Sequence, residues 1–204
     1  MSKSKGNILD PLEIIKKYGV DSLRYYLIKE VSFGNDGNIS EEKLENCINS
    51  DLANNYGNLC QRVLSFCEKN ADFKVGESIK FNEDDNLELL KFTDNYLNIV
   101  GFIDKQDINS YISFIVERLF AANKYFNDQE PWKKKDNKVR LNTIIYTSLE
   151  LIRKITILMY PIMPETSIKV MSIFNYSEKD IKLDSFIENN FIKKNIKLNK
   201  IGIL

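Results

Sequence analysis

Apolar residues recur every three or four positions along most of the chain after residue 40, which is the spacing of one buried helical face. Ser40 precedes the acidic residues Glu41 and Glu42, as an N-cap precedes a negatively charged first turn. The apolar stripe that follows consists of Ile48, Leu52, Tyr56, Leu59, Val63 and Cys67. The pattern predicts one long helix from about residue 41 to 67.

A polar stretch from Asn70 to Asp85 ends this helix, and a second amphipathic segment follows it. The residues of the second segment that we expect to be buried are Leu87, Leu90, Leu97 and Phe102. The acidic residues 83–85 favour the N-terminus of this helix rather than a metal site.

Three more helices are predicted before residue 175. The third carries apolar residues from Ile108 to Phe126 and ends near Pro131, because a residue before proline is disfavoured in the helical conformation. The fourth covers about 136–160, and Pro164 opens a fifth. The sequence therefore predicts a mainly α fold, with a bundle of about five helices over residues 40–190.

The first 39 residues have a different pattern, with short apolar segments between turn-forming residues. Asp10 and Pro11 are typical of a helix start, Gly19 ends that helix, and Asp21 caps another. A glycine- and asparagine-rich turn at 33–38 separates this small unit from the bundle.

Charge is unevenly distributed along the chain, although the 29 basic and 29 acidic residues cancel. The net charge is −1 over residues 1–67, −6 over 68–130 and +7 over 131–204. A basic end can face a nucleic acid, but acidic and basic helices that pack side by side give the same asymmetry. Charge alone leaves both interpretations open.

Composition excludes several kinds of site. The chain has no histidine, so a histidine general base, a Ser-His or Cys-His pair and a histidine zinc site are excluded. The three cysteines are an odd number without C-x-x-C spacing, so neither a disulfide framework nor a thiolate metal site is suggested, and a reducing compartment fits. Cys60 and Cys67 lie on or next to the apolar face of the first predicted helix, where we expect buried thiols. No apolar run approaches the roughly 18 residues of a membrane span. We therefore expect a cytoplasmic protein with no metal site and no membrane partner.

The segment Met1-Ser2-Lys3-Ser4-Lys5-Gly6-Asn7 is the most informative motif. Two ammonium groups and two hydroxyls on a glycine-containing loop can fold over a polyphosphate and neutralise charge during nucleotidyl transfer. An ordinary basic N-terminus has the same composition.

This loop resembles the KMSKS signature of class I aminoacyl-tRNA synthetases, entered at its second residue. Three further blocks resemble the methionyl-tRNA synthetase family, namely Phe33-Gly34-Asn35-Asp36-Gly37, residues 51–59 (DLANNYGNL) and Glu130-Pro131-Trp132. The resemblance covers essentially the whole chain. It implies the C-terminal part of such an enzyme, from the KMSKS loop through the anticodon-binding domain.

For residues 1–39 the resemblance implies the KMSKS loop and a small α/β stem-contact unit. Lys3 would bind ATP and stabilise the pyrophosphate leaving group, with Ser2 and Ser4 in the same loop. No HIGH-type motif accompanies the loop, so the Rossmann catalytic domain is expected to be absent and this polypeptide alone unable to form methionyl-adenylate. ATP and Mg²⁺ would then be used by the full enzyme, and no cofactor is expected to be bound to this fragment. Zinc ligands, where family members have them, would belong to the absent part.

For the bundle the resemblance implies a site for the CAU anticodon at Asn58, Arg62, Pro131 and Trp132. The spacing of Asn58 and Arg62 puts an amide and a guanidinium on one helical face, which suits the edge of an unstacked base. Trp132 offers a flat stacking surface. Without the family, two solvated helix residues are the favoured interpretation of Asn58 and Arg62. For Trp132, a place in the core between helices is then as good an interpretation as a stacking surface.

A basic cluster follows the tryptophan and is expected to contact phosphates, although a solvated first helical turn explains it as well. It consists of Lys133, Lys134, Lys135, Lys138 and Arg140. The expected partners are the anticodon stem-loop of tRNA(Met) and the absent catalytic domain, toward which a tail of residues 191–204 would return.

The leading hypothesis is thus the tRNA-binding C-terminal portion of a methionine–tRNA ligase. The alternative is a free-standing tRNA-binding protein from a truncated or split synthetase gene, without catalysis. The DNA upstream of the first codon distinguishes the two. A synthetase for Leu, Ile or Val and a helical scaffold without an RNA role are further rivals.

Overall fold

The first predicted helix is present as a continuous rod in the computed structural model, which describes residues 10–31, 39–188 and 192–200. It comprises α3 (Glu41–Cys47), a π-helical segment (Ile48–Gly57) and α4 (Asn58–Ala71). Ser40 caps its start, because the Ser40 Oγ accepts a hydrogen bond from the Lys43 amide at 3.2 Å. Four residues of the predicted stripe are buried, which are Tyr56, Leu59, Val63 and Cys67. Ile48 and Leu52 are half-buried against the same core.

The other predicted bundle helices are also confirmed, and the second is divided. The bounds are α5 (Glu83–Asp94), α6 (Tyr96–Asp104), α7 (Ile108–Asp128), α8 (Lys138–Met159) and α9 (Pro164–Met171). The division falls at Asn95, whose side-chain amide donates to the Lys91 carbonyl at 2.8 Å. Asparagine competes in this way with the backbone ladder, so one helix ends and the next begins there.

Three of the four residues that the second segment was expected to bury are exposed, whereas the fourth, Phe102, is half-buried against the core. Leu87, Leu90 and Leu97 are 52%, 42% and 79% exposed. The side chains that point into the bundle are instead Asp85, Leu89, Phe92 and Ile99. The reason is Asp85, a buried carboxylate that forms an ion pair with Arg140 and brings its own face of α5 inward.

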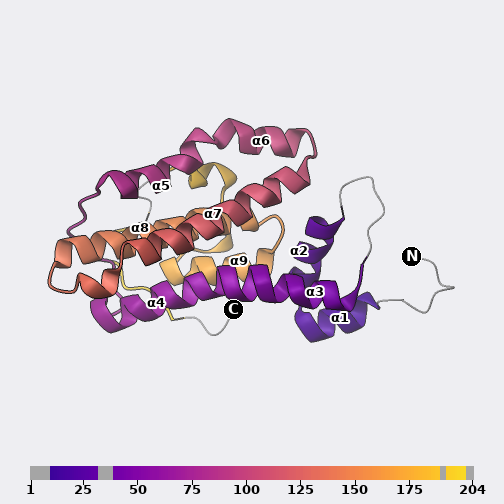
Figure 1. Ribbon diagram of the computed structural model, residues 1–204, viewed down its shortest axis with the longest axis horizontal. Helices are drawn as coiled ribbons and strands as arrows, with labels where there is room; N and C mark the ends of the chain where they lie inside the picture. Colours follow the sequence, from indigo (N-terminus) through magenta and orange to yellow (C-terminus); the bar gives the residue numbers. More distant parts are fainter. Residues whose placement is uncertain (1–9, 32–38, 189–191, 201–204) are drawn as a thin grey trace.

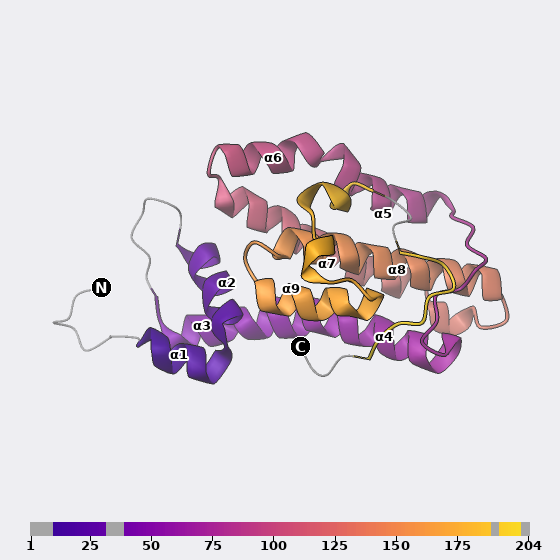
Figure 2. The same ribbon diagram turned by 180° about the vertical axis from the view of Figure 1, so that it is seen from behind.

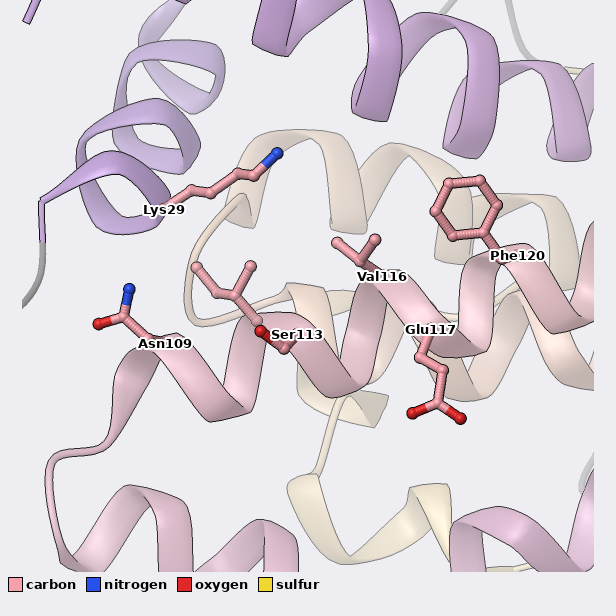
Figure 3. A pocket seen from close by; sticks show the side chains of 7 residues that line it. Lys29, Asn109, Ser113, Val116, Glu117 and Phe120 are labelled. Carbon is pink, nitrogen blue, oxygen red and sulfur yellow. The ribbon is translucent and has the colours of Figure 1, made fainter.

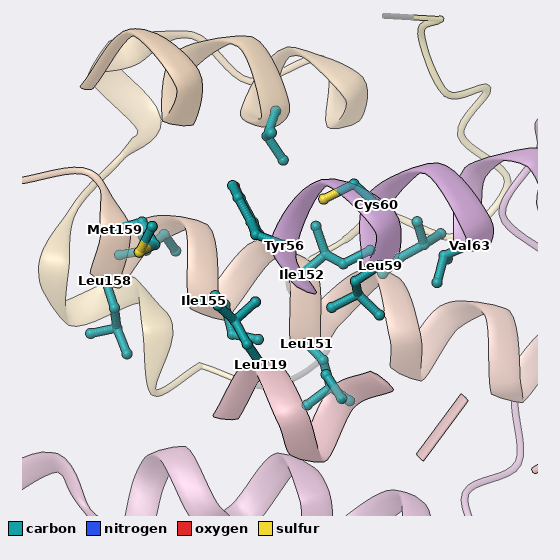
Figure 4. Close-up of a cluster of buried hydrophobic side chains, with 14 of the residues drawn as sticks. Tyr56, Leu59, Cys60, Val63, Leu119, Leu151, Ile152, Ile155, Leu158 and Met159 are labelled. Atoms are coloured by element: carbon teal, nitrogen blue, oxygen red, sulfur yellow. The ribbon is translucent and has the colours of Figure 1, made fainter. Parts of the chain in front are cut away.

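Helix α8 is the centre of the bundle. It lies between α7 on one side and α9 on the other, with α4 and α5 along its edges (Figures 1 and 2). Every residue from Thr143 to Met159 is buried. Figure 4 shows how Ile152 and Ile155 of α8 meet Tyr56 and Leu59 of the long rod in one apolar cluster. Burial on all sides explains why α8 hides polar as well as apolar residues.

A buried ionic cluster on α8 holds the segment that follows α9. Arg153 pairs with Glu150 at 2.8 Å and donates to the carbonyls of Ser185 at 3.0 Å and Glu188 at 2.8 Å. The Lys154 ammonium donates to the carbonyl of Glu188 at 2.9 Å. Burial, together with the neighbouring Arg153 cation, lowers the pKa of Lys154 to about 7. These contacts satisfy the buried charges and fix residues 185–188 across α8.

The described part of the C-terminal tail lies along the bundle. The Leu198 amide donates to the Phe73 carbonyl at 2.7 Å, and the Val75 amide donates to the Ile196 carbonyl at 2.9 Å. Residues 192–200 therefore pair with the chain just after α4. Residues 191 and 201–204 lie outside the described part, and a return toward another domain stays a prediction.

The small N-terminal unit contributes α1 (Pro11–Tyr18) and α2 (Val20–Glu30), joined at Gly19, whose φ of 83° favours glycine. Its expected α/β character is not seen in residues 10–31, which hold these two helices and no strand.

The unit is packed directly on the bundle. The Arg24 guanidinium donates to the carbonyls of Pro161 and Ile162, both at 2.8 Å. The Asp21 carboxylate accepts from the Thr166 amide of α9 at 2.7 Å. The division of the chain at residue 39 stays a prediction, and these bonds tie the two sides of that boundary together.

Candidate nucleic-acid interface

The predicted nucleotide loop, with Ser2, Lys3 and Ser4, lies outside the described residues. The predicted anticodon residues all lie inside them. The connection between α7 and α8, which carries Pro131 and Trp132, is at the end of the bundle opposite α1 and α2 (Figure 1). A molecule that contacts both the N-terminal unit and this connection must therefore span the long axis of the bundle.

Asn58 and Arg62 are both on the first two turns of α4. Asn58 is exposed, whereas Arg62 is half-buried. The Arg62 guanidinium lies over the ring of Phe126, 5.5 Å from its centroid, and its Nη2 donates to the Asn127 side-chain oxygen. Arg62 is thus held against the C-terminal turn of α7, with part of its donor edge still accessible.

Trp132 contacts the same phenylalanine. Pro131 is buried and begins a short 3₁₀ turn (Pro131–Lys133) that projects the indole, which is 43% exposed. The ring centroids of Trp132 and Phe126 are 6.4 Å apart, with their planes at 70°. The two rings therefore form an edge-to-face contact, and the exposed part of the indole remains open to a ligand.

Phe126 and Asn127 were not among the predicted site residues. Phe126 appeared in the sequence only as an apolar residue of the third helix, and it is indeed buried. In the structure Phe126 also contacts both Arg62 and Trp132. Its ring packs on that of Phe66 of α4, with the two ring centroids 5.9 Å apart. The available signal was its place in the last turn before Pro131, since that turn must lie next to the tryptophan.

The basic cluster after Trp132 divides into two groups. Lys133 pairs with Glu130 at 2.7 Å, the Lys134 ammonium donates to the Gln129 carbonyl at 2.6 Å, and Lys135 and Lys138 are exposed. Arg140 instead points inward, where its two Nη atoms lie 2.5 and 3.0 Å from the Asp85 carboxylate. These contacts occupy the guanidinium of Arg140, which is half-buried.

A separate pocket of about 440 Å³ lies between α2 and α7 (Figure 3). Lys29 points into it from α2, and Val116 and Phe120 line it from α7. None of the predicted site residues lines this pocket. Within the described ranges, no group of three or more acidic or cysteine side chains is placed to hold a metal ion.

The three cysteines are buried free thiols, as the sequence predicted for Cys60 and Cys67. Burial raises the pKa of both Cys60 and Cys67 to about 12, and that of Cys47 to about 11. Such thiols are poor nucleophiles. No helix within residues 10–31, 39–188 and 192–200 is long and apolar enough to cross a membrane.

The arrangement around Phe126 suits binding of a flat, hydrogen-bonding ligand rather than covalent catalysis.

Two family models match the chain. The model described as "tRNA synthetases class I (M)" matches residues 1–64, and the "Anticodon binding domain of methionyl tRNA ligase" matches residues 102–193. The predicted loop and Arg62 lie in the first range, and Trp132 lies in the second.

Curated relatives agree with the two models. The chain is similar to the methionine–tRNA ligase of Mycobacterium leprae, with 40% identity over 184 residues, which are 87% of this chain and 34% of the relative. The Thermotoga maritima enzyme is 37% identical over 184 residues, covering 89% of this chain and 29% of the relative. The chain thus spans about a third of the length of the curated relatives it matches.

A solved structure extends the match to the fold. Mycobacterium tuberculosis methionyl-tRNA synthetase in complex with methionyl-adenylate superposes with a TM-score of 0.91 and 33% identity, over 99% of this chain and 40% of that one. The family models match residues 1–64 and 102–193, the relatives cover 87–89% of the chain and the fold superposes over 99% of it. These comparisons agree, and the chain belongs to the methionyl-tRNA synthetase family.

Proposed function

We propose that these residues are the tRNA-recognition part of a methionine–tRNA ligase, which attaches methionine to tRNA(Met) through methionyl-adenylate. Their own task is to bind the CAU anticodon at the end of the bundle opposite the N-terminal unit. The observation that carries the proposal is the meeting of Arg62 and Trp132 on Phe126, since residues 70 positions apart in sequence form one accessible surface there.

The chemistry of this surface fits an anticodon loop, whose bases are unstacked and readable on their edges. The open face of Trp132 stacks on one base, and the donors of Asn58 and Arg62 bond the edge of another. Pro131 is buried and restricts the backbone that presents the indole. The ammonium groups of the cluster contact the phosphates of the loop. They belong to Lys133, Lys135 and Lys138, which are exposed, and to Lys134, which is half-buried.

Adenylate formation needs groups beyond those described above. In this proposal ATP and Mg²⁺ are used by the complete enzyme, where Lys3 stabilises the pyrophosphate leaving group and a Rossmann catalytic domain supplies the rest of the site. The 204 residues by themselves bind tRNA and do not activate methionine. We place the enzyme in the cytoplasm, which the three free thiols support.

The proposal is tested with the purified 204-residue chain and a CAU anticodon hairpin. We expect binding that weakens steeply between 50 and 200 mM salt, because phosphate contacts release counterions. The same preparation should show no methionine-dependent pyrophosphate exchange. Absence of hairpin binding at low salt, or exchange activity in the isolated chain, would contradict the proposal.

A further inference from the structure

The turn that carries Trp132 is tied to the start of α5 by one glutamine. Gln129 is buried at the end of α7, three residues before the tryptophan. Its Nε2 donates to the Asp84 carboxylate at 3.0 Å, and its Oε1 accepts from Arg140 Nη2 at 2.5 Å. Both ends of the side-chain amide are therefore engaged by residues outside the turn.

Arg140 is in turn fixed by Asp85, which has no exposed surface. The Asp85 carboxylate accepts from both Nη atoms of Arg140 and from the Tyr125 hydroxyl, and it also caps α5 through the Asn82 amide at 2.8 Å. A bidentate pair of this kind fixes direction as well as distance. Gln129 therefore bonds to a rigid point of the bundle.

The next residue of the turn needs such support. Glu130 has φ 41° and ψ 58°, which is the left-handed region of the backbone. Residues other than glycine and asparagine rarely adopt this region. Backbone conformations of this kind persist only where the surroundings determine them, and they gather at functional sites. Bonds within the turn alone, such as the Lys133 amide to the Glu130 carbonyl at 2.9 Å, move with it and do not set its place on the bundle.

We propose that Gln129, held by Asp84 and by the Asp85–Arg140 pair, is a positioning residue that sets where Trp132 stands for anticodon binding. The inference rests on the function proposed above. It assigns Asp84, Asp85, Gln129 and Arg140 to presentation of the indole rather than to contact with RNA.

The chain offers a matched pair of variants for the test. Asp84 and Glu83 are neighbouring exposed acids in the first turn of α5, so replacing either by alanine removes one negative charge and a similar helix-terminus interaction. Only Asp84→Ala removes the bond to Gln129. Asp84→Asn removes the charge but keeps an oxygen that accepts this bond.

Trp132 is the only tryptophan, so its fluorescence reports the turn directly, with no RNA present. Relative to Glu83→Ala, we expect Asp84→Ala to increase acrylamide quenching of the indole, with a melting temperature that matches the control. Binding of the CAU hairpin should weaken about threefold to tenfold, as for one lost hydrogen bond. Asp84→Asn should restore both values, and Gln129→Ala should reproduce the loss.

The proposal is overturned if Asp84→Ala matches Glu83→Ala in quenching, or if the two variants differ in melting temperature alone. The two proposals fail separately. If the unaltered chain does not bind the hairpin, the proposed function fails, whereas the quenching of free protein still decides whether Gln129 positions the indole.

Discussion

Trp132→Ala is expected to weaken binding of a CAU anticodon hairpin by about tenfold to a hundredfold, because base–aromatic stacking contributes roughly 1–3 kcal/mol per base. The indole is 43% exposed, so its removal takes away the flat surface but leaves the Phe126 core contact with Phe66 in place. Affinity is measured by fluorescence anisotropy of a labelled hairpin at one fixed salt concentration.

Two further variants make this measurement specific. Trp132→Phe keeps a smaller stacking ring and should retain much of the affinity. Lys179→Ala removes a positive charge from an exposed turn whose neighbour Glu178 accepts from Tyr160, at the far end of α8. Equal losses for Trp132→Ala and Lys179→Ala would mean that the hairpin does not stack on this indole.

Arg153→Met should lower the free energy of unfolding by about 3–5 kcal/mol, the usual cost of leaving one partner of a buried ion pair alone. Both Arg153 and Glu150 are fully buried, and the loss also frees the carbonyl of Ser185. Urea unfolding followed by circular dichroism gives the value. Since a few kcal/mol is a large part of a domain's stability, this is the largest effect on folding that we expect.

The control for this prediction is Lys17→Ala, which removes an exposed ammonium that pairs with Glu41 and Glu45. Exposed pairs of this kind contribute little. Adding Glu150→Gln to Arg153→Met should recover part of the loss, because it removes the uncompensated charge. If the Arg153→Met and Lys17→Ala proteins have the same free energy of unfolding, Arg153 and Glu150 do not form a buried ion pair in solution.

Most of the helices followed from local patterns in the sequence. Ser40, Pro131 and Pro164 mark helix ends through interactions within a few residues, and the structure has ends there. The buried face of α5 did not follow from its pattern. Leucines are common on exposed faces too, and the residue that decided the matter was Asp85, whose partner is 55 positions away.

The candidate site divides in the same way. The family resemblance selected Arg62 and Trp132, and in the structure both contact Phe126. Asn127 and Gln129 were missed because their roles depend on partners in other helices, at Arg62 and Arg140. A run of basic residues likewise gives no sign that one member, Arg140, turns inward.

The central claim is that this bundle recognises the CAU anticodon, and the most direct test compares hairpins that differ by one anticodon base. The same stem with each of the three bases replaced in turn keeps the phosphates constant, so any difference in dissociation constant reports base recognition. We predict that the CAU hairpin binds at least about tenfold more tightly than every substituted hairpin. Equal affinity for all four would leave only electrostatic binding and would contradict the account.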